Sequence, residues 1–98
     1  MIDLYPPLDL AATRVLIAND DGVHAPGIKV LEKVLRPLVK DVWVVAPEAE
    51  QSAASHSLTM RRPLYLHQVG RHHFAVNGTP TDCVLLAIHH LMKESPPD

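Results

Sequence analysis

The segment from residue 14 to residue 27, RVLIANDDGVHAPG, constrains the fold more than any other part of the chain. Its apolar run at residues 15–18 is rich in β-branched side chains, which is typical of a strand buried on both faces of a sheet. A turn-forming cluster follows at residues 19–22, and Pro26 suits the first turn of a helix. The segment therefore predicts a strand, a tight turn and a helix, the opening elements of an α/β fold.

The helix that begins at Pro26 is predicted to be amphipathic. Its apolar residues recur at helical spacing and are expected to face the sheet: Ile28, Leu31, Leu35 and Leu38. The charged residues between them are expected on the opposite face: Lys29, Glu32, Lys33 and Arg36. Pro37 is expected to end or kink this helix near Arg36, and residues 42–46 are expected to form a second buried strand. A strand, a helix and a strand of these lengths predict a right-handed βαβ unit with two parallel strands.

The second half of the chain contains a predicted hairpin and a predicted helix. Residues 63–69 and 72–76 flank a turn at Gly70 and Arg71, which is the pattern of two antiparallel strands. Thr79 and Asp82 have the spacing of a capping box at the start of a helix over residues 79–93. Because residues 83–88 are apolar on every side, we expect this helix to be largely buried.

Composition and charge restrict the class of protein. The chain has 98 residues, 47% hydrophobic and 20% charged, as in a single globular domain. A formal net charge of −2 does not favour a nucleic-acid partner. The sequence shows neither a recognisable membrane span nor a recognisable signal peptide. The single cysteine, Cys83, excludes an intramolecular disulfide and suits a reducing cytoplasm. We expect residues 1–12 to form an extended leader and residues 13–98 to form the domain.

Two adjacent carboxylates, Asp20 and Asp21, are the strongest candidates for chemistry. They follow the first predicted strand, and open α/β sheets bind ligands at the carboxyl ends of their strands. A divalent cation would relieve their mutual repulsion, and their hard oxygens suit Mg²⁺ or Mn²⁺. Such a metal polarises a phosphoryl oxygen and lowers the pKa of a bound water. The competing interpretation is a polar turn between a strand and a helix that binds nothing.

Further polar candidates lie in loops. The polar segment at residues 48–57 starts at the same sheet edge, because it follows the second parallel strand. Its serines, Ser52 and Ser55, are candidates for a hydroxyl ligand or a phosphate contact. His24 and His56 are candidates for acid–base catalysis, since histidine titrates near neutral pH. For each of these side chains, simple solvation in a surface loop is the competing interpretation.

Three segments resemble the N-terminal part of the SurE nucleotidases, the stationary-phase survival proteins: VLIANDDGVHAPGI, VVAPEAEQSAASHSLT and VNGTPTDCV. They occur in the order and spacing of that family, and the resemblance covers residues 14–98. It implies a Rossmann-like three-layer α/β/α fold and a metal-dependent phosphomonoesterase. The implied substrates are nucleoside 5′-monophosphates, often 3′-monophosphates and, for some members, short polyphosphate.

The resemblance also implies a set of metal ligands. In the family, one divalent metal ion is held by paired aspartates, a loop serine and a later asparagine. The paired aspartates match Asp20 and Asp21, and the serine matches Ser52. Asn19, His24 and Ser55 are then candidates for side chains that support the ligands or contact substrate.

The chain is also shorter than the family pattern. The family's asparagine belongs to a strand that would begin beyond Asp98, and the C-terminal part of family members supplies an arm used in homo-oligomer formation. We therefore expect a truncated member that binds metal weakly and turns over little substrate.

Two other functional classes remain open on the sequence. A receiver domain also begins with a strand that ends in paired acids binding Mg²⁺, but it needs a phosphoacceptor aspartate after a later strand. Here the second predicted strand ends in Ala46, Pro47 and Glu48, and Asp82 lies at a helix start. A non-catalytic metal-binding or interaction module is the other alternative for a truncated chain. Metal binding through Asp20 and Asp21 separates a nucleotidase from a purely structural interaction module.

Overall fold

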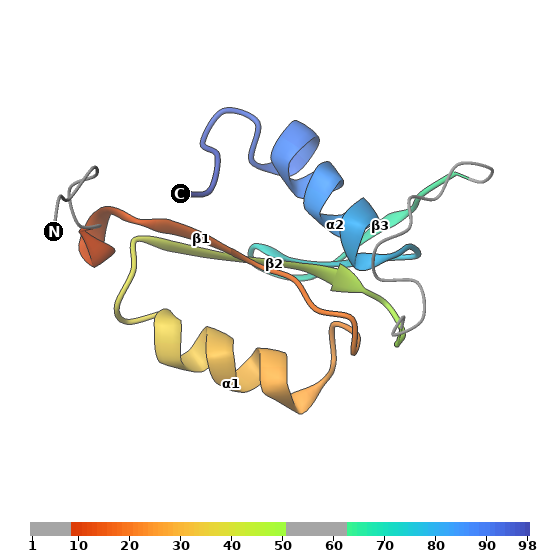
Figure 1. Ribbon diagram of the computed structural model, residues 1–98, viewed down its shortest axis with the longest axis horizontal. Helices are drawn as coiled ribbons and strands as arrows, with labels where there is room; N and C mark the ends of the chain where they lie inside the picture. Colours follow the sequence, from red (N-terminus) through yellow and green to blue (C-terminus); the bar gives the residue numbers. More distant parts are fainter. Residues whose placement is uncertain (1–8, 51–62) are drawn as a thin grey trace, which may run out of the picture.

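The computed structural model describes residues 9–50 and 63–98, which form a four-stranded sheet between two helices (Figure 1). The strands, in the spatial order β1-β2-β4-β3, are β1 (Arg14–Ile17), β2 (Asp41–Pro47), β3 (Leu66–Gly70) and β4 (His73–Val76). β1, β2 and β4 are parallel, and β3 is antiparallel to β4. Helix α1 (Pro26–Leu35) covers one face and helix α2 (Pro80–Leu86) the other. This arrangement confirms the predicted three-layer α/β/α fold.

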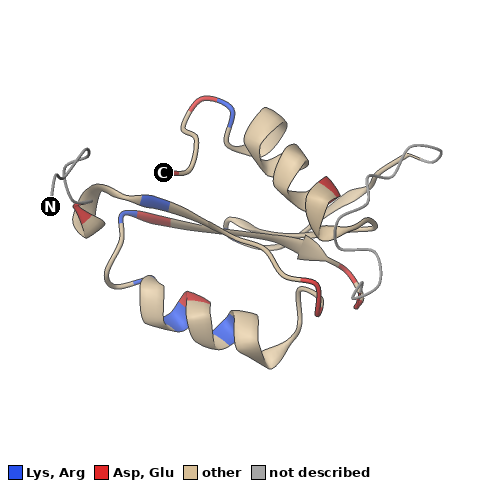
Figure 2. Cartoon of the chain, in the orientation of Figure 1, with Lys and Arg blue, Asp and Glu red and all other residues tan. Residues whose placement is uncertain are grey.

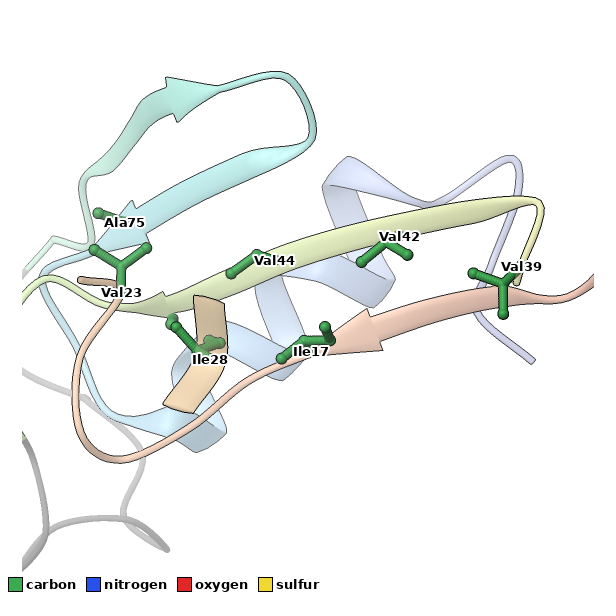
Figure 3. Close-up of a cluster of buried hydrophobic side chains, with 8 residues drawn as sticks. Ile17, Val23, Ile28, Val39, Val42, Val44 and Ala75 are labelled. Atoms are coloured by element: carbon green, nitrogen blue, oxygen red, sulfur yellow. The ribbon is translucent and has the colours of Figure 1, made fainter. Parts of the chain in front are cut away.

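One core lies between the sheet and α1 (Figure 3). Its buried members are aliphatic: Ile17, Val23, Ile28, Val39, Val42, Val44, Ala46 and Ala75. A second core lies on the α2 side and contains Val45, Phe74, Val76, Cys83 and Ala87. Because side chains alternate along a strand, Val44 enters the first core and its neighbour Val45 enters the second. The continuous apolar run of β2 thus reflects burial on both faces, as predicted.

Two predictions about the burial of β1 and α1 are wrong. β1 lies at one edge of the described sheet, so only Ile17 among its residues is buried. α1 is rotated so that Glu32 turns inward, with its Oε1 3.7 Å from Nδ1 of His73. Leu31 is 47% exposed, and Leu38, which lies beyond the end of α1, is 50% exposed. The apolar arc of this helix is wider than the side that docks, and helical spacing alone does not say which part of the arc meets the sheet.

The hairpin forms as predicted, but its turn is shifted by one residue. Gly70 pairs with His73, so the turn consists of Arg71 and His72. His72 adopts a φ of 54°, in the left-handed region that histidine enters more readily than most residues. The turn position with a positive φ is therefore occupied by a histidine. The glycine that the sequence pattern places in the turn belongs to β3 instead.

α2 begins with the predicted capping box. The hydroxyl of Thr79 accepts a hydrogen bond from the backbone N–H of Asp82, and the carboxylate of Asp82 accepts one from the N–H of Thr79. The helix continues as a π-helical turn, Ala87–Leu91, and ends two residues before the predicted residue 93. Its burial is one-sided, since Leu85 and Ile88 are 38% and 37% exposed. The prediction of a largely buried helix is therefore wrong for its outer face.

The two ends of the described chain lie near the start of β1. Leu10–Ala12 form a 3₁₀ helix, where extended chain was expected. The N–H of Asp98 donates to the carbonyl of Arg14 at 2.9 Å, and the carboxylate of Asp98 accepts from the N–H of Arg14 at 2.7 Å. The division into a leader and a domain at residue 12 stays a prediction. Within residues 9–50 and 63–98, no helix has the length and apolarity that crossing a membrane requires.

Candidate metal centre

The carboxyl ends of β1, β2 and β4 lie at one edge of the sheet, because these strands are parallel. Two backbone hydrogen bonds connect the segments that follow them. Val23 N–H donates to the carbonyl of Pro47 at 2.7 Å, and Glu48 N–H donates to that of Val76 at 2.8 Å. Figure 2 shows the acidic residues that follow β1 and β2 gathered at this end of the molecule. The edge predicted to bind a ligand therefore carries acidic residues from two neighbouring segments.

The turn that carries the two aspartates is closed by Asn19. Its Nδ2 donates to the carbonyl of Gly22 at 2.9 Å, and its Oδ1 accepts from the N–H of Gly22 at 3.2 Å. Gly22 is buried and has a φ of 104°, which residues with a side chain rarely adopt. Val23 is fully buried in the core below. Asp20 and Asp21 therefore lie in a turn that is fixed on both sides.

The two carboxylates have no structural partner among the residues that the structure describes. Asp20 is half-buried and Asp21 is exposed, and neither takes part in a hydrogen bond or an ion pair within residues 9–50 and 63–98. In the same ranges, no cluster of three or more histidine, cysteine, aspartate or glutamate side chains is arranged to hold a metal ion. The described chain thus contributes a pair of adjacent hard oxygen donors, which fits the chemistry of Mg²⁺ or Mn²⁺.

The remaining predicted site residues divide into two groups. His24 is described and exposed, and it lies on the same turn as the aspartates, two residues after Gly22. Ser52, Ser55 and His56 fall within residues 51–62, outside the described part of the chain. The proposed roles of these side chains stay predictions.

Asn77, which follows β4, has a role that the sequence analysis did not identify. Its Oδ1 accepts from the N–H of Tyr65 at 2.5 Å, and its Nδ2 donates to the carbonyl of Pro63 at 3.4 Å. A Cβ on the neighbouring Gly78 would lie 2.6 Å from the carboxylate of Asp82, so no larger residue fits there. The available signal was the asparagine itself, because its side chain commonly bonds to nearby backbone.

Cys83 lies near this edge but does not have the properties of a nucleophile. It is fully buried in the core under α2. Burial, and then the neighbouring charge of Asp82, raise the pKa of its thiol to about 12. Since the thiolate is the reactive form, this cysteine is a structural residue of the core.

Comparison with known proteins identifies relatives of this segment. The family model described as "Survival protein SurE" matches residues 15–98. A 5′-nucleotidase SurE of Paramagnetospirillum magneticum is 60% identical over 95 residues, which cover 96% of this chain and 36% of the relative. Another, from Bradyrhizobium diazoefficiens, is 58% identical over 85 residues, covering 87% and 33%.

A solved structure matches the fold as well. The crystal structure of a SurE protein from Aquifex aeolicus superimposes with a TM-score of 0.77 at 38% identity, covering 87% of this chain and 34% of that one. The chain therefore spans about a third of the length of the relatives that it matches.

Proposed function

The chain belongs to the SurE family, and we propose that it provides the metal site of a phosphomonoesterase that hydrolyses nucleoside 5′-monophosphates to nucleoside and phosphate. The proposal extends to 3′-monophosphates and short polyphosphate as further substrates. The relatives named 5′-nucleotidase SurE support the class of reaction. The observation that supports it most is a fixed turn at the carboxyl edge that carries Asp20 and Asp21 without partners among the described residues.

The proposed cofactor is one Mg²⁺ or Mn²⁺ held by Asp20, Asp21 and the hydroxyl of Ser52. Few protein ligands are needed, because Mg²⁺ keeps several of its waters when it binds to proteins. When bound, the metal polarises a phosphoryl oxygen and lowers the pKa of a coordinated water. Asn19 and Ser55 are proposed to support these ligands or to contact substrate.

The reaction exchanges one bond at phosphorus for another. A water oxygen bonds to phosphorus and gives up one proton, the bond from phosphorus to the nucleoside oxygen breaks, and that leaving oxygen takes up a proton. The turn fixes the backbone that carries the two carboxylates before substrate arrives, which would reduce the reorganisation needed during the reaction. His24, exposed on the same turn, is the proposed donor of the proton to the leaving oxygen.

The metal site is tested by titrating Mn²⁺ into the chain in a calorimeter. We expect Asp20→Asn and Asp21→Asn each to abolish most of the binding, because each removes one of the two charged donors. Glu94→Gln is the matched control, since Glu94 is an exposed carboxylate far from this turn in the sequence. Unchanged affinity in both aspartate variants would refute the site.

The reaction is tested in a chimera in which residues 15–98 of this chain replace the matching third of the Paramagnetospirillum magneticum relative. We expect the chimera to release phosphate from a nucleoside 5′-monophosphate in the presence of Mn²⁺. Asp20→Asn should remove several kcal/mol of transition-state stabilisation. A folded chimera without activity, beside an active parent, would contradict the proposal.

A further inference from the structure

We propose that Asn19 is a positioning residue for Asp20 and Asp21, a role that rests on the metal site proposed above. Its carboxamide reaches across the turn and engages both polar backbone groups of Gly22, at 2.9 Å and 3.2 Å. The two aspartates are the only residues between Asn19 and Gly22. One side chain therefore closes the loop of backbone that carries both carboxylates.

The other contacts of this turn hold the chain beyond the aspartates. Ala25 N–H donates to the carbonyl of Gly22 at 3.1 Å, and Val23 N–H donates to Pro47 at 2.7 Å. These bonds fix where the chain enters α1, but glycine itself permits many backbone conformations. Among the described residues, Asn19 alone contributes side-chain hydrogen bonds to the turn. Fixing the residues between 19 and 22 thus depends on its carboxamide.

The charge of the pair explains why such a bridge matters. Two adjacent carboxylates repel each other, and rotation of the backbone between them would carry them apart when no cation is bound. The bonds from Asn19 to Gly22 oppose that rotation, so the backbone that carries the pair is held before a cation binds. Removing a partner that orients metal ligands commonly lowers metal affinity by about 10- to 100-fold.

The test compares Asn19→Ala, which removes both hydrogen bonds, with Asn19→Ser, whose hydroxyl can accept from a nearby backbone N–H more weakly. We expect calorimetry with Mn²⁺ alone to give about a 10-fold loss of affinity for Asn19→Ala and a partial recovery for Asn19→Ser. In the metal-free chain, hydrogen exchange at the Gly22 amide should be fastest in Asn19→Ala and intermediate in Asn19→Ser, because Oδ1 accepts from that N–H.

A matched control separates positioning from general stability. Phe74→Leu opens a cavity in the core on the α2 side, which contains no residue of the turn. Under conditions where it stays folded, it should bind Mn²⁺ as the unmodified chain does. The positioning role is overturned if Phe74→Leu weakens binding as much as Asn19→Ala, or if Asn19→Ala changes neither Mn²⁺ affinity nor Gly22 exchange while Asp20→Asn abolishes binding. Unchanged affinity in Asp20→Asn instead refutes the metal site, so the two failures are distinguishable.

Discussion

Asp41, at the amino end of the parallel strands, is flanked by two basic side chains, whereas Asp20 and Asp21, at the carboxyl end, have no such partners among the described residues. Arg14 Nε lies 3.6 Å from one oxygen of Asp41, and His72 Nδ1 lies 3.8 Å from the other. This group links β1, β2 and the hairpin turn. The carboxylate of Asp41 therefore has a structural role that the two aspartates of the opposite end lack.

The two ends are also held together by different kinds of contact. At the amino end, the ring of His72 stacks on Trp43, with centroids 3.8 Å apart and planes 9° from parallel, and Glu32 contacts both His73 and Arg36. At the carboxyl end, neutral groups fix the chain, chiefly the carboxamide of Asn19. Among the described residues, Asp41 is paired within the fold, whereas Asp20 and Asp21 are not. In the proposed site, this leaves the two aspartates as the candidates for binding a cation.

The largest effect is expected from Gly22→Ala, which would disturb the turn at the carboxyl end of β1. A side chain at a φ of 104° is strained, and we expect a loss of about 1–3 kcal/mol in the free energy of unfolding, with loss of Mn²⁺ binding. Gly27→Ala is the control, because a Cβ there meets no atom within 4 Å and Gly27 lies in α1. It should stabilise the chain by up to about 1 kcal/mol. Urea unfolding followed by circular dichroism measures the stability of both variants. Equal effects of Gly22→Ala and Gly27→Ala would contradict the strain expected at Gly22.

A smaller effect is expected when single charges are removed from the two ends. Asp41→Asn should cost up to about 1 kcal/mol, less at high salt, because Asp41 and its partners are partly exposed. Asp21→Asn in metal-free buffer should leave stability within about 0.5 kcal/mol of the unmodified chain, since no described contact is lost. Unfolding at low and high salt distinguishes the two. A larger loss in Asp21→Asn than in Asp41→Asn would reverse the comparison.

The smallest effect at neutral pH concerns Cys83, which lies in the core under α2. Burial raises the pKa of its thiol from 9.0 to about 12, so the folded chain holds a proton that the unfolded chain has lost at high pH. Its contribution to stability is complete below pH 9 and is lost as the pH rises toward 12. We expect Cys83→Ala to show a flatter decline of stability over that range. Iodoacetamide should alkylate Cys83 at pH 8 only when urea unfolds the chain, and rapid alkylation of the folded chain would contradict this burial.

Much of the architecture could be predicted from local sequence. The apolar run of β2, Pro26 at the start of α1 and the Thr79–Asp82 capping box each specify an element through short-range physics. The order of these elements then restricts the topology to a parallel pair joined by a helix. The candidate site followed from the same logic, because residues after a parallel strand lie at the ligand-binding edge wherever the chain goes next.

The tertiary structure alone decided how these elements dock and which charges find partners. Periodicity defines an apolar arc on α1, but the contact of Glu32 with His73 involves residues far apart in the chain, and it coincides with the exposure of Leu31. Likewise, sequence distinguishes Asp41 from Asp20 only weakly, since both flank a strand. Arg14 and His72 reach Asp41 because three separate segments meet at the amino end. No comparable side chain among the described residues reaches Asp20 or Asp21. The turn that carries them is held by neutral groups, the carboxamide of Asn19 and the backbone of Gly22.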